Sequence, residues 1–207
     1  MNRYYEQTKR KIDFLLSIAV IIIFFPICIL IATLIMIDTK GFCLYKTKRL
    51  GRGGAFFNKY KFRTMVPNAE EVLKKILEEN SHIRKEYKEN YKIEYDPRIT
   101  RFGKFLRKFS LDELPQFINV LKGDMSIVGP RDIIEQELDD HYNHCKEKFL
   151  SVKPGITGLW QVSGRSRLTY EERVKLDMFY IENRSLLFDF KIILKTPYVM
   201  IKGDGAI

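Results

Sequence analysis

The sequence predicts an α+β fold that is mostly helical, with an N-terminal re-entrant membrane helix, a short β-hairpin and amphipathic helices at a membrane interface. Three observations support this prediction. Residues 14–37 form an apolar run without a charge. Two β-prone segments flank a glycine-rich turn at residues 51–54. Much of the remaining chain repeats apolar residues at helical spacing, with charged residues between them.

The length and charge of the chain limit what it can be. Its 207 residues and mass of 24.5 kDa favour one domain with at most an appendage. The 36 basic and 26 acidic residues indicate an anionic partner, such as nucleic acid, an anionic membrane surface or a phosphorylated substrate. Cys28, Cys43 and Cys145 show neither metal nor disulfide spacing, which fits a reducing compartment.

The apolar run from Phe14 to Ile37 contains 24 residues, enough to cross a bilayer core of about 30 Å. A plain spanning helix is therefore the simple interpretation. Pro26 lies near the middle, however, where it removes a backbone hydrogen bond and favours a kink or a break. Basic residues flank the run on both sides, and the positive-inside rule places both flanks in the cytoplasm. We therefore expect a re-entrant helix over residues 1–40 and a cytoplasmic domain over residues 41–207.

A β-hairpin is expected next. Residues 42–45 and 56–62 are β-prone, and the glycine-rich segment between them predicts the turn. Lys61 and Arg63 would share one face of the second strand. Without other evidence, such a pair is usually a solvated strand face.

Charged helices should follow the hairpin. A helix is expected to begin at Pro67, with acidic residues in its first turn, and Asp96-Pro97 should end the helical region. Residues 99–109 then interleave aromatic and basic side chains. This pattern suits a nucleic acid or a membrane interface, and the nearby apolar anchor favours the membrane.

Two adjacent carboxylates, Asp112 and Glu113, follow this basic segment and precede a helical apolar repeat that ends at Gly123. Two starts for that helix are open. Ser110 could be the N-cap, with Glu113 closing a capping box, or the helix could begin near Pro115. Either start places both carboxylates at the positive end of the helix dipole, which also favours a phosphate brought to them. An isolated motif of this kind is commonly only a cap.

A turn at residues 129–131 presents Arg131 shortly after this helix, and the planar guanidinium fork matches phosphate oxygens. His141, His144 and Cys145 resemble a metal cluster, but the fourth zinc ligand is missing, so we expect surface residues there.

The last third of the chain is expected to combine a loop with two helices. Residues 154–165 are rich in turn-forming residues and hold the only tryptophan, which predicts a surface loop. Residues 170–180 are helix-like, and residues 188–201 predict a packed or interfacial helix that is too basic to span a membrane.

A series of motifs runs through nearly the whole chain. In order, these are Lys9-Arg10-Lys11 with Asp13, the apolar run broken by Pro26, Lys61 to Met65, Asp96 to Thr100, Arg107 with Ser110 to Gln116, Asn119 to Ser126, Gly129-Pro130-Arg131 and Lys153 to Gly158. The series resembles the bacterial sugar transferases, which are monotopic polyprenol-phosphate phosphoglycosyl transferases.

The resemblance implies transfer of a sugar 1-phosphate from a UDP-sugar to undecaprenyl phosphate, with Mg²⁺ as cofactor, release of UMP and a covalent phospho-sugar enzyme. Asp112 would be the nucleophile and a Mg²⁺ ligand, and Glu113 would assist it. Four cations would hold or approach phosphate oxygens: Lys61, Arg63, Arg107 and Arg131. Pro26 would mark the break in the membrane helix. Residues 41–207 would form the catalytic domain, at the cytoplasmic face of the bacterial inner membrane, where surface glycan synthesis begins.

The sequence departs from the family pattern in places. Phe25 stands before Pro26 where serine is common, and Asp132 follows Arg131 where proline is common. Residues 158–165 resemble relatives that transfer glucose or galactose 1-phosphate, so a hexose donor is expected, with the choice between the two undecided. A homodimer is an open alternative. A membrane-tethered nucleic-acid-binding or scaffold protein would explain the charge and the anchor but not the motif series.

Overall fold

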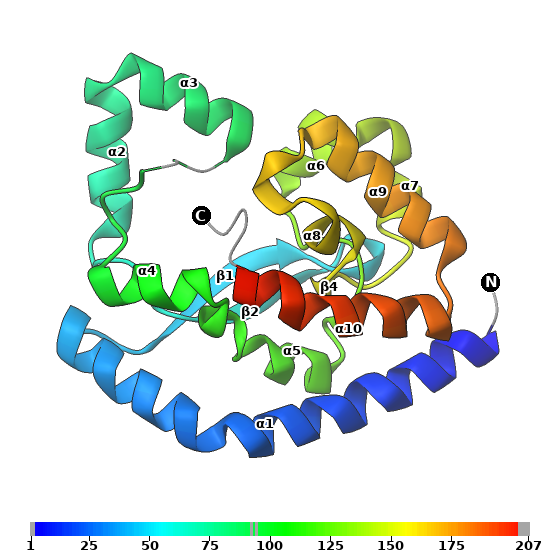
Figure 1. Cartoon of the computed structure of the whole chain (residues 1–207). Coiled ribbons are helices and arrows are strands. Elements are labelled where there is room, and N and C mark those ends of the chain that lie inside the picture. Colours follow the sequence, from blue (N-terminus) through cyan, green and yellow to red (C-terminus); the bar gives the residue numbers. More distant parts are fainter. Residues whose placement is uncertain (1–2, 92, 94, 203–207) are drawn as a thin grey trace.

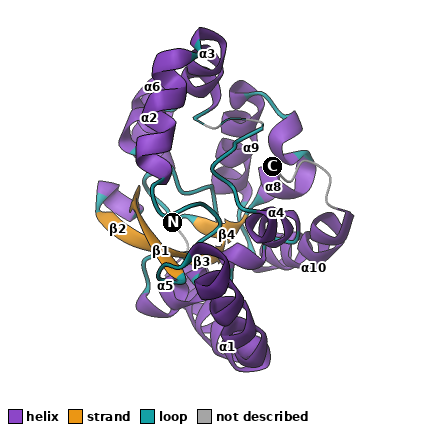
Figure 2. Cartoon of the chain, turned by 90° about the vertical axis from the view of Figure 1, so that its left-hand side faces the viewer, coloured by secondary structure: helices purple, strands orange, loops and turns teal. Residues whose placement is uncertain are grey.

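One long helix and two small β-sheets organise the computed structural model, which describes residues 3–91, 93 and 95–202. Helix α1 (Arg3–Thr39) runs along one side, and the strands lie between it and helices α2, α3, α6, α7 and α9 (Figures 1 and 2). The α-helices after α1 are α2 (Ala69–Glu79), α3 (Ser81–Asn90), α4 (Arg101–Lys108), α5 (Gln116–Lys122), α6 (Glu135–His141), α7 (Lys146–Phe149), α8 (Leu159–Ser163), α9 (Tyr170–Asn183) and α10 (Leu186–Lys202). The expected fold, mostly helical with a short hairpin, is confirmed.

Helix α1 is continuous through Pro26, so the expected break is a bend instead. The helix has 37 residues and curves in its middle (Figure 1). A proline in a helix removes one backbone hydrogen bond and favours such a kink, but the turns on both sides keep their own bonds.

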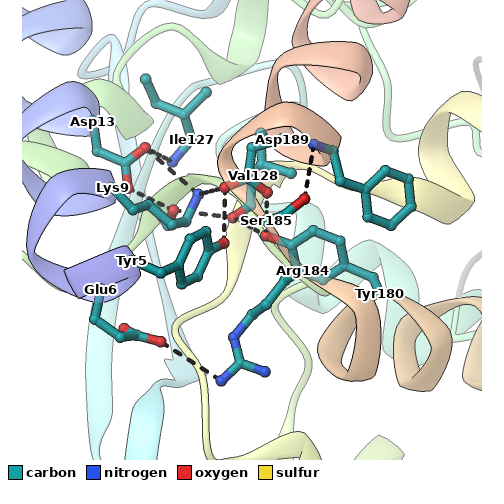
Figure 3. A network of polar contacts seen from close by, with 12 residues as sticks. Tyr5, Glu6, Lys9, Asp13, Ile127, Val128, Tyr180, Arg184, Ser185 and Asp189 are labelled. Carbon is teal, nitrogen blue, oxygen red and sulfur yellow. Dashed lines mark hydrogen bonds and ion pairs between the residues drawn. The ribbon is translucent and has the colours of Figure 1, made fainter. Parts of the chain in front are cut away.

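The N-terminal part of α1 is fixed to the rest of the chain by buried polar contacts (Figure 3). Asp13 accepts hydrogen bonds from the Ser126 hydroxyl at 2.6 Å and from the backbone N–H of Ile127. The Tyr5 hydroxyl and the Lys9 ammonium both donate to Asp189 of α10, at 2.8 and 2.9 Å. These contacts attach the start of α1 to two segments far along the chain.

The C-terminal part of α1 packs against the same folded body. Ile31 and Ile35 are 4% and 1% exposed and form a core cluster with Phe62 and Leu106. Between the two attached ends, the apolar window of α1 has a mean hydropathy of 3.2 and only 11% of it is buried. The middle of α1 is therefore an exposed apolar surface and not a core helix.

The hairpin pairs β1 (Leu44–Leu50) with β2 (Phe56–Phe62) in antiparallel register, from Leu44 opposite Phe62 to Leu50 opposite Phe56. The first strand begins two residues later and extends further than expected, because cross-strand pairing continues through the charged residues. A short 3₁₀ turn, η1 (Arg52–Gly54), closes the hairpin. Gly53 has a φ of 71°, which favours glycine.

A parallel pair of short strands brings two distant motifs together. Strand β3 (Ser126–Val128) pairs with β4 (Gly155–Thr157). A Cβ atom on Gly155 would lie 2.1 Å from the backbone nitrogen of Gly129, so neither chain could approach as closely with a larger residue. This contact places the turn that carries Arg131 beside the segment that carries the tryptophan.

The structure decides between the two starts left open for the helix that ends at Gly123. Ser110 has a φ of 53° and caps nothing with its side chain, so the capping box with Glu113 does not form. Helix α5 instead begins after Pro115, as in the second alternative, and ends at Gly123 with a φ of 89°. Residues 154–165 are not a surface loop, since Trp160 lies in α8 and is 4% exposed.

The attachment of both ends of α1 to one body predicts that both ends lie on the same side of a membrane. In a variant whose native cysteines are serine, single cysteines at Arg3 and at Lys40 should both resist a membrane-impermeant thiol reagent in whole cells. Both should react after lysis, which controls for accessibility. Labelling of only one of the two in whole cells would show a spanning helix and contradict the prediction.

Candidate functional site

The residues expected from the sequence to bind substrate line one cavity of about 730 Å³. Its walls come from the hairpin, the start of α2, the segment around α4 and α5, the turn after β3, and α8. The six predicted side chains are Lys61, Arg63, Arg107, Asp112, Glu113 and Arg131. The cavity therefore gathers groups that are far apart along the sequence.

Lys61 joins the two adjacent carboxylates. Its ammonium donates to Glu113 Oε1 at 2.7 Å and to Asp112 Oδ2 at 3.3 Å. Asp112 is only 5% exposed. A buried carboxylate needs a charged partner or hydrogen bonds to offset the loss of water, and the Lys61 ammonium supplies the charge.

The same contacts shift the pKa values of the pair. Burial alone would raise the pKa of Glu113, but the ammonium groups of Lys61 and Lys59 lower it below its usual value. Burial alone would lower the pKa of Lys61, but Asp112 and Glu113 raise it. At neutral pH, Glu113 is therefore held as a carboxylate and Lys61 as an ammonium.

Helix α4 brings Arg107 to the carboxylates. The helix is capped by Thr100, whose hydroxyl accepts from the N–H of Gly103 at 2.9 Å. A Cβ atom on Gly103 would lie 2.1 Å from the backbone oxygen of Thr64, so the helix packs directly on the chain after β2. Arg107 then donates to the Thr64 hydroxyl at 3.0 Å. Burial lowers the pKa of Arg107, and the nearby Asp112 opposes this shift.

Arg63 and Arg131 line the cavity without a direct contact to the carboxylates. Arg63 donates to the backbone oxygen of Phe42 at 2.8 Å, just beyond the end of α1. Among the residues that the structure describes, no hydrogen bond or ion pair joins Arg63 to Asp112 or Glu113. Arg131 lies over the ring of Trp160, with its guanidinium carbon 5.3 Å from the ring centre.

Sequence reasoning missed a second, buried ion cluster in this cavity. Lys59 is 6% exposed and pairs with Asp132, which also accepts from Arg49 at 2.9 Å. Burial lowers the pKa of Lys59 to about 8. Asp132, noted above as a departure from the family pattern, therefore has a defined partner. The alternation of Lys59, Lys61 and Arg63 on one face of the hairpin was the available signal.

A third group, from the segment 158–165 that the sequence linked to the donor sugar, forms the wall beside Arg131. Trp160, Gln161 and Arg165 all line the cavity. Each has a buried polar atom without a partner in the described chain: the indole nitrogen, the side-chain amide oxygen and one guanidinium nitrogen. Buried polar atoms are rarely left unpaired, so this wall has the capacity to bind a polar ligand.

The cavity offers few ligands for a metal ion. Within residues 3–91, 93 and 95–202, no three His, Cys, Asp or Glu side chains gather in a way that could hold a metal. Mg²⁺ is commonly held by one or two carboxylates together with substrate phosphates, and Asp112 beside Glu113 fits that arrangement. His141 instead stacks on the Tyr170 ring, with centroids 3.9 Å apart.

Comparison with known proteins identifies the family. Residues 4–203 match the family model described as bacterial sugar transferase. An undecaprenyl-phosphate galactose phosphotransferase of Salmonella typhimurium is 46% identical over 198 residues, which are 96% of this chain and 41% of the relative. The exopolysaccharide production protein ExoY of Sinorhizobium fredii is 42% identical over 96% of this chain and 88% of its own length.

A more distant relative, a UDP-N-acetylgalactosamine-undecaprenyl-phosphate N-acetylgalactosaminephosphotransferase of Aeromonas hydrophila, is 35% identical over 98% of this chain and 45% of its own length. This chain thus spans less than half the length of the Salmonella and Aeromonas relatives but most of the length of ExoY. Since the family model covers nearly the whole sequence, the chain belongs to the bacterial sugar transferase family.

Proposed function

We propose that this chain is a phosphoglycosyl transferase that moves a sugar 1-phosphate from a UDP-sugar to undecaprenyl phosphate and releases UMP. The observation that carries the proposal is the contact of Lys61 with two adjacent carboxylates in a cavity that is otherwise rich in arginine. Cations offset the charge of phosphoryl oxygens, and a carboxylate can attack phosphorus. The Salmonella and Aeromonas relatives, which are named as undecaprenyl-phosphate sugar phosphotransferases, support the same reaction class.

Asp112 is the proposed nucleophile. In the first step, a carboxylate oxygen of Asp112 forms a bond to the β-phosphorus of the UDP-sugar. The bond from that phosphorus to the bridging oxygen breaks, and UMP leaves with the bridging oxygen. In the second step, an oxygen of undecaprenyl phosphate attacks the same phosphorus and restores the carboxylate. Two steps let each anionic substrate react with the enzyme separately.

The cations have distinct proposed roles. Lys61 contacts Asp112, and Arg107 lies close enough to interact electrostatically with it, so both would offset the charge that develops on the transferred phosphoryl group. Arg131, held over Trp160, would bind the β-phosphate of the UDP-sugar donor. Arg63 lies beside the carbonyl of Phe42, close to the end of the membrane helix, which suits the phosphate of a lipid acceptor. Glu113 would assist Asp112 or the acceptor.

Mg²⁺ is the proposed cofactor, with Asp112 as its protein ligand. When bound, Mg²⁺ supplies positive charge to the phosphoryl oxygens. The adjacent acids Asp112 and Glu113 fit such an ion because the substrate phosphates would complete its ligands.

The proposed location is the cytoplasmic face of the bacterial inner membrane, with α1 embedded from that face only. Both ends of α1 contact the same body, while its middle exposes large apolar residues such as Ile22, Ile23 and Phe25. An acceptor with a long apolar chain would then present its phosphate at the interface from which the cavity is reached.

The proposed donor is a UDP-hexose, with galactose or glucose left open. The Salmonella relative is named for galactose, whereas the more distant Aeromonas relative is named for N-acetylgalactosamine. Gln161 and Arg165 are two of the cavity side chains that have a polar atom without a partner among the described residues, and they are suited to read sugar hydroxyls. Pocket shape can exclude an acetamide group, but glucose and galactose differ by one hydroxyl orientation, which only hydrogen bonds can distinguish.

Replacement of the nucleophile tests covalent catalysis. Asp112→Asn should lower UMP release by about a thousandfold or more, even without acceptor, because an amide oxygen cannot form the acyl phosphate. Glu113→Gln should also lower UMP release severely. Asp139→Asn, which removes an acid that is 55% exposed and outside the cavity, is the matched control and should keep normal turnover. Substantial turnover by Asp112→Asn, or sequential kinetics, would show that the mechanism is wrong.

Removal of divalent cations tests the cofactor. UMP release should stop when EDTA is present and return when excess Mg²⁺ is added, because the phosphoryl charge is otherwise incompletely offset. Binding of the UDP-sugar, followed by quenching of Trp160 fluorescence, should also strengthen when Mg²⁺ is added. Full activity in EDTA would contradict the proposal.

Comparison of four donors tests the sugar. UMP release should be fast from UDP-glucose or UDP-galactose and slow from UDP-GlcNAc and UDP-diNAc-bacillosamine, because the cavity is expected to exclude the acetamide group. A preference for either acetylated donor would refute the hexose assignment and leave the reaction type intact.

A further inference from the structure

A second cavity, of about 600 Å³, lies where the N-terminal part of α1 meets the hairpin turn and the segment before β4. It shares no lining residue with the cavity that contains Asp112. The wall formed by α1 and the end of α9 is visible in Figure 3. Two acids, Glu6 and Asp13, line this cavity, against six cations: Lys9, Arg10, Lys11, Arg52, Lys153 and Arg184.

The two acids are already committed to other groups. Asp13 accepts from Ser126 and lies 3.8 Å from the Lys9 ammonium. Glu6 is shared between Arg52 at 3.8 Å and Arg184 at 3.6 Å, and the latter contact is drawn in Figure 3. Positive charge in this cavity therefore exceeds the negative charge that is available to offset it.

Lys153 shows this excess most clearly. It is half-buried, and nowhere in the described chain does its ammonium form a hydrogen bond or an ion pair. Burial lowers its pKa, and the neighbouring Arg10 and Arg52 lower it further. The ammonium of Lys153 and one guanidinium nitrogen of Arg10 each lie 3.5 Å from the point where Gly123 would carry a Cβ atom. The two cations thus converge on the open side of one glycine.

The arginines of this cavity are only partly offset by acids, since Arg52 and Arg184 share the single carboxylate of Glu6. Arg10 donates to the backbone oxygens of Val120 and Leu121 at the end of α5, and carbonyl groups leave its charge uncompensated. Arg184 has a buried Nε without a partner in the part of the chain described here. An excess of cations of this kind is stabilised by an anion with several acceptor oxygens, such as a phosphate, because ammonium and guanidinium groups form strong hydrogen bonds to such oxygens.

We propose that this cavity binds the phosphate group of an anionic membrane lipid. The position of the cavity beside the apolar surface of α1 favours a lipid as the ligand. The apolar surface of α1 begins within one turn of Arg10 and Lys11, at Ile12 and Leu15, which are 39% and 65% exposed. A lipid whose phosphate contacts Lys153 would have its acyl chains along this surface. Lipid binding at this site would make the stability of the fold depend on the amount of anionic lipid in the surrounding bilayer.

The test measures thermal unfolding of the full chain in neutral detergent while lipid is added. Dioleoyl-phosphatidylglycerol should raise the midpoint with a saturable dependence, whereas dioleoyl-phosphatidylcholine should not. Lys153→Gln and Arg52→Gln should each raise the required concentration of phosphatidylglycerol about tenfold, because each removes a charged donor. Lys175→Gln, at a lysine that is 70% exposed and outside this cavity, is the matched control and should behave as the unmodified chain.

A third titration with inorganic phosphate distinguishes the source of the anion. Saturable protection by phosphate alone, lost in Lys153→Gln, would support the phosphate site and assign it to a soluble phosphate compound. Two variants keep the test decisive if one of them folds poorly. The proposal would be overturned if a folded variant, Lys153→Gln or Arg52→Gln, responded to phosphatidylglycerol as the unmodified chain does. Because the readout is binding, the outcome does not depend on the proposed transferase activity.

Discussion

The burial of a carboxylate at Asp112 is the constraint on which the site depends. Removing an ion from water costs several kcal/mol unless a counter-charge replaces the lost hydration. Lys61 of the hairpin provides that charge, and Arg107 of α4 lies close enough to influence the same group. Since these cations come from separate elements, the hairpin, α4 and the turn that carries Asp112 and Glu113 must be arranged together. Loss of Lys61 would remove the only cation that contacts both carboxylates among the described residues, so charge balance and fold are coupled here.

The contacts of α1 connect the apolar helix to the elements that hold Lys61 and the two carboxylates. Arg10 donates to the last carbonyls of α5, and α5 follows directly after the turn that holds Asp112 and Glu113. The other end of α1 packs on Phe62, next to Lys61. The apolar helix is therefore not a flexible tether, since both of its ends are bonded or packed against elements that form the candidate site.

The features that could be predicted from the sequence depend on local patterns. The apolar run, the second strand of the hairpin, the helix after Pro115 and the carboxylate pair all follow from composition, periodicity or residue type. The burial of Trp160 could not be predicted in this way. It depends on Arg131 and Arg173, which lie over the indole ring at 5.3 and 5.2 Å and come from distant segments. The cluster of Lys59, Asp132 and Arg49 likewise needs the tertiary fold, because Asp132 lies far along the sequence from the two cations of the hairpin.

The central claim is that Asp112 becomes covalently linked to the sugar phosphate. The most direct measurement is peptide mapping by mass spectrometry after the enzyme has been incubated with a UDP-hexose and Mg²⁺ in the absence of acceptor, then quenched in acid. The account predicts a hexose-phosphate adduct on the peptide that contains Asp112, which disappears when undecaprenyl phosphate is added before the quench. An adduct on a different residue, or turnover without any trapped adduct, would contradict it.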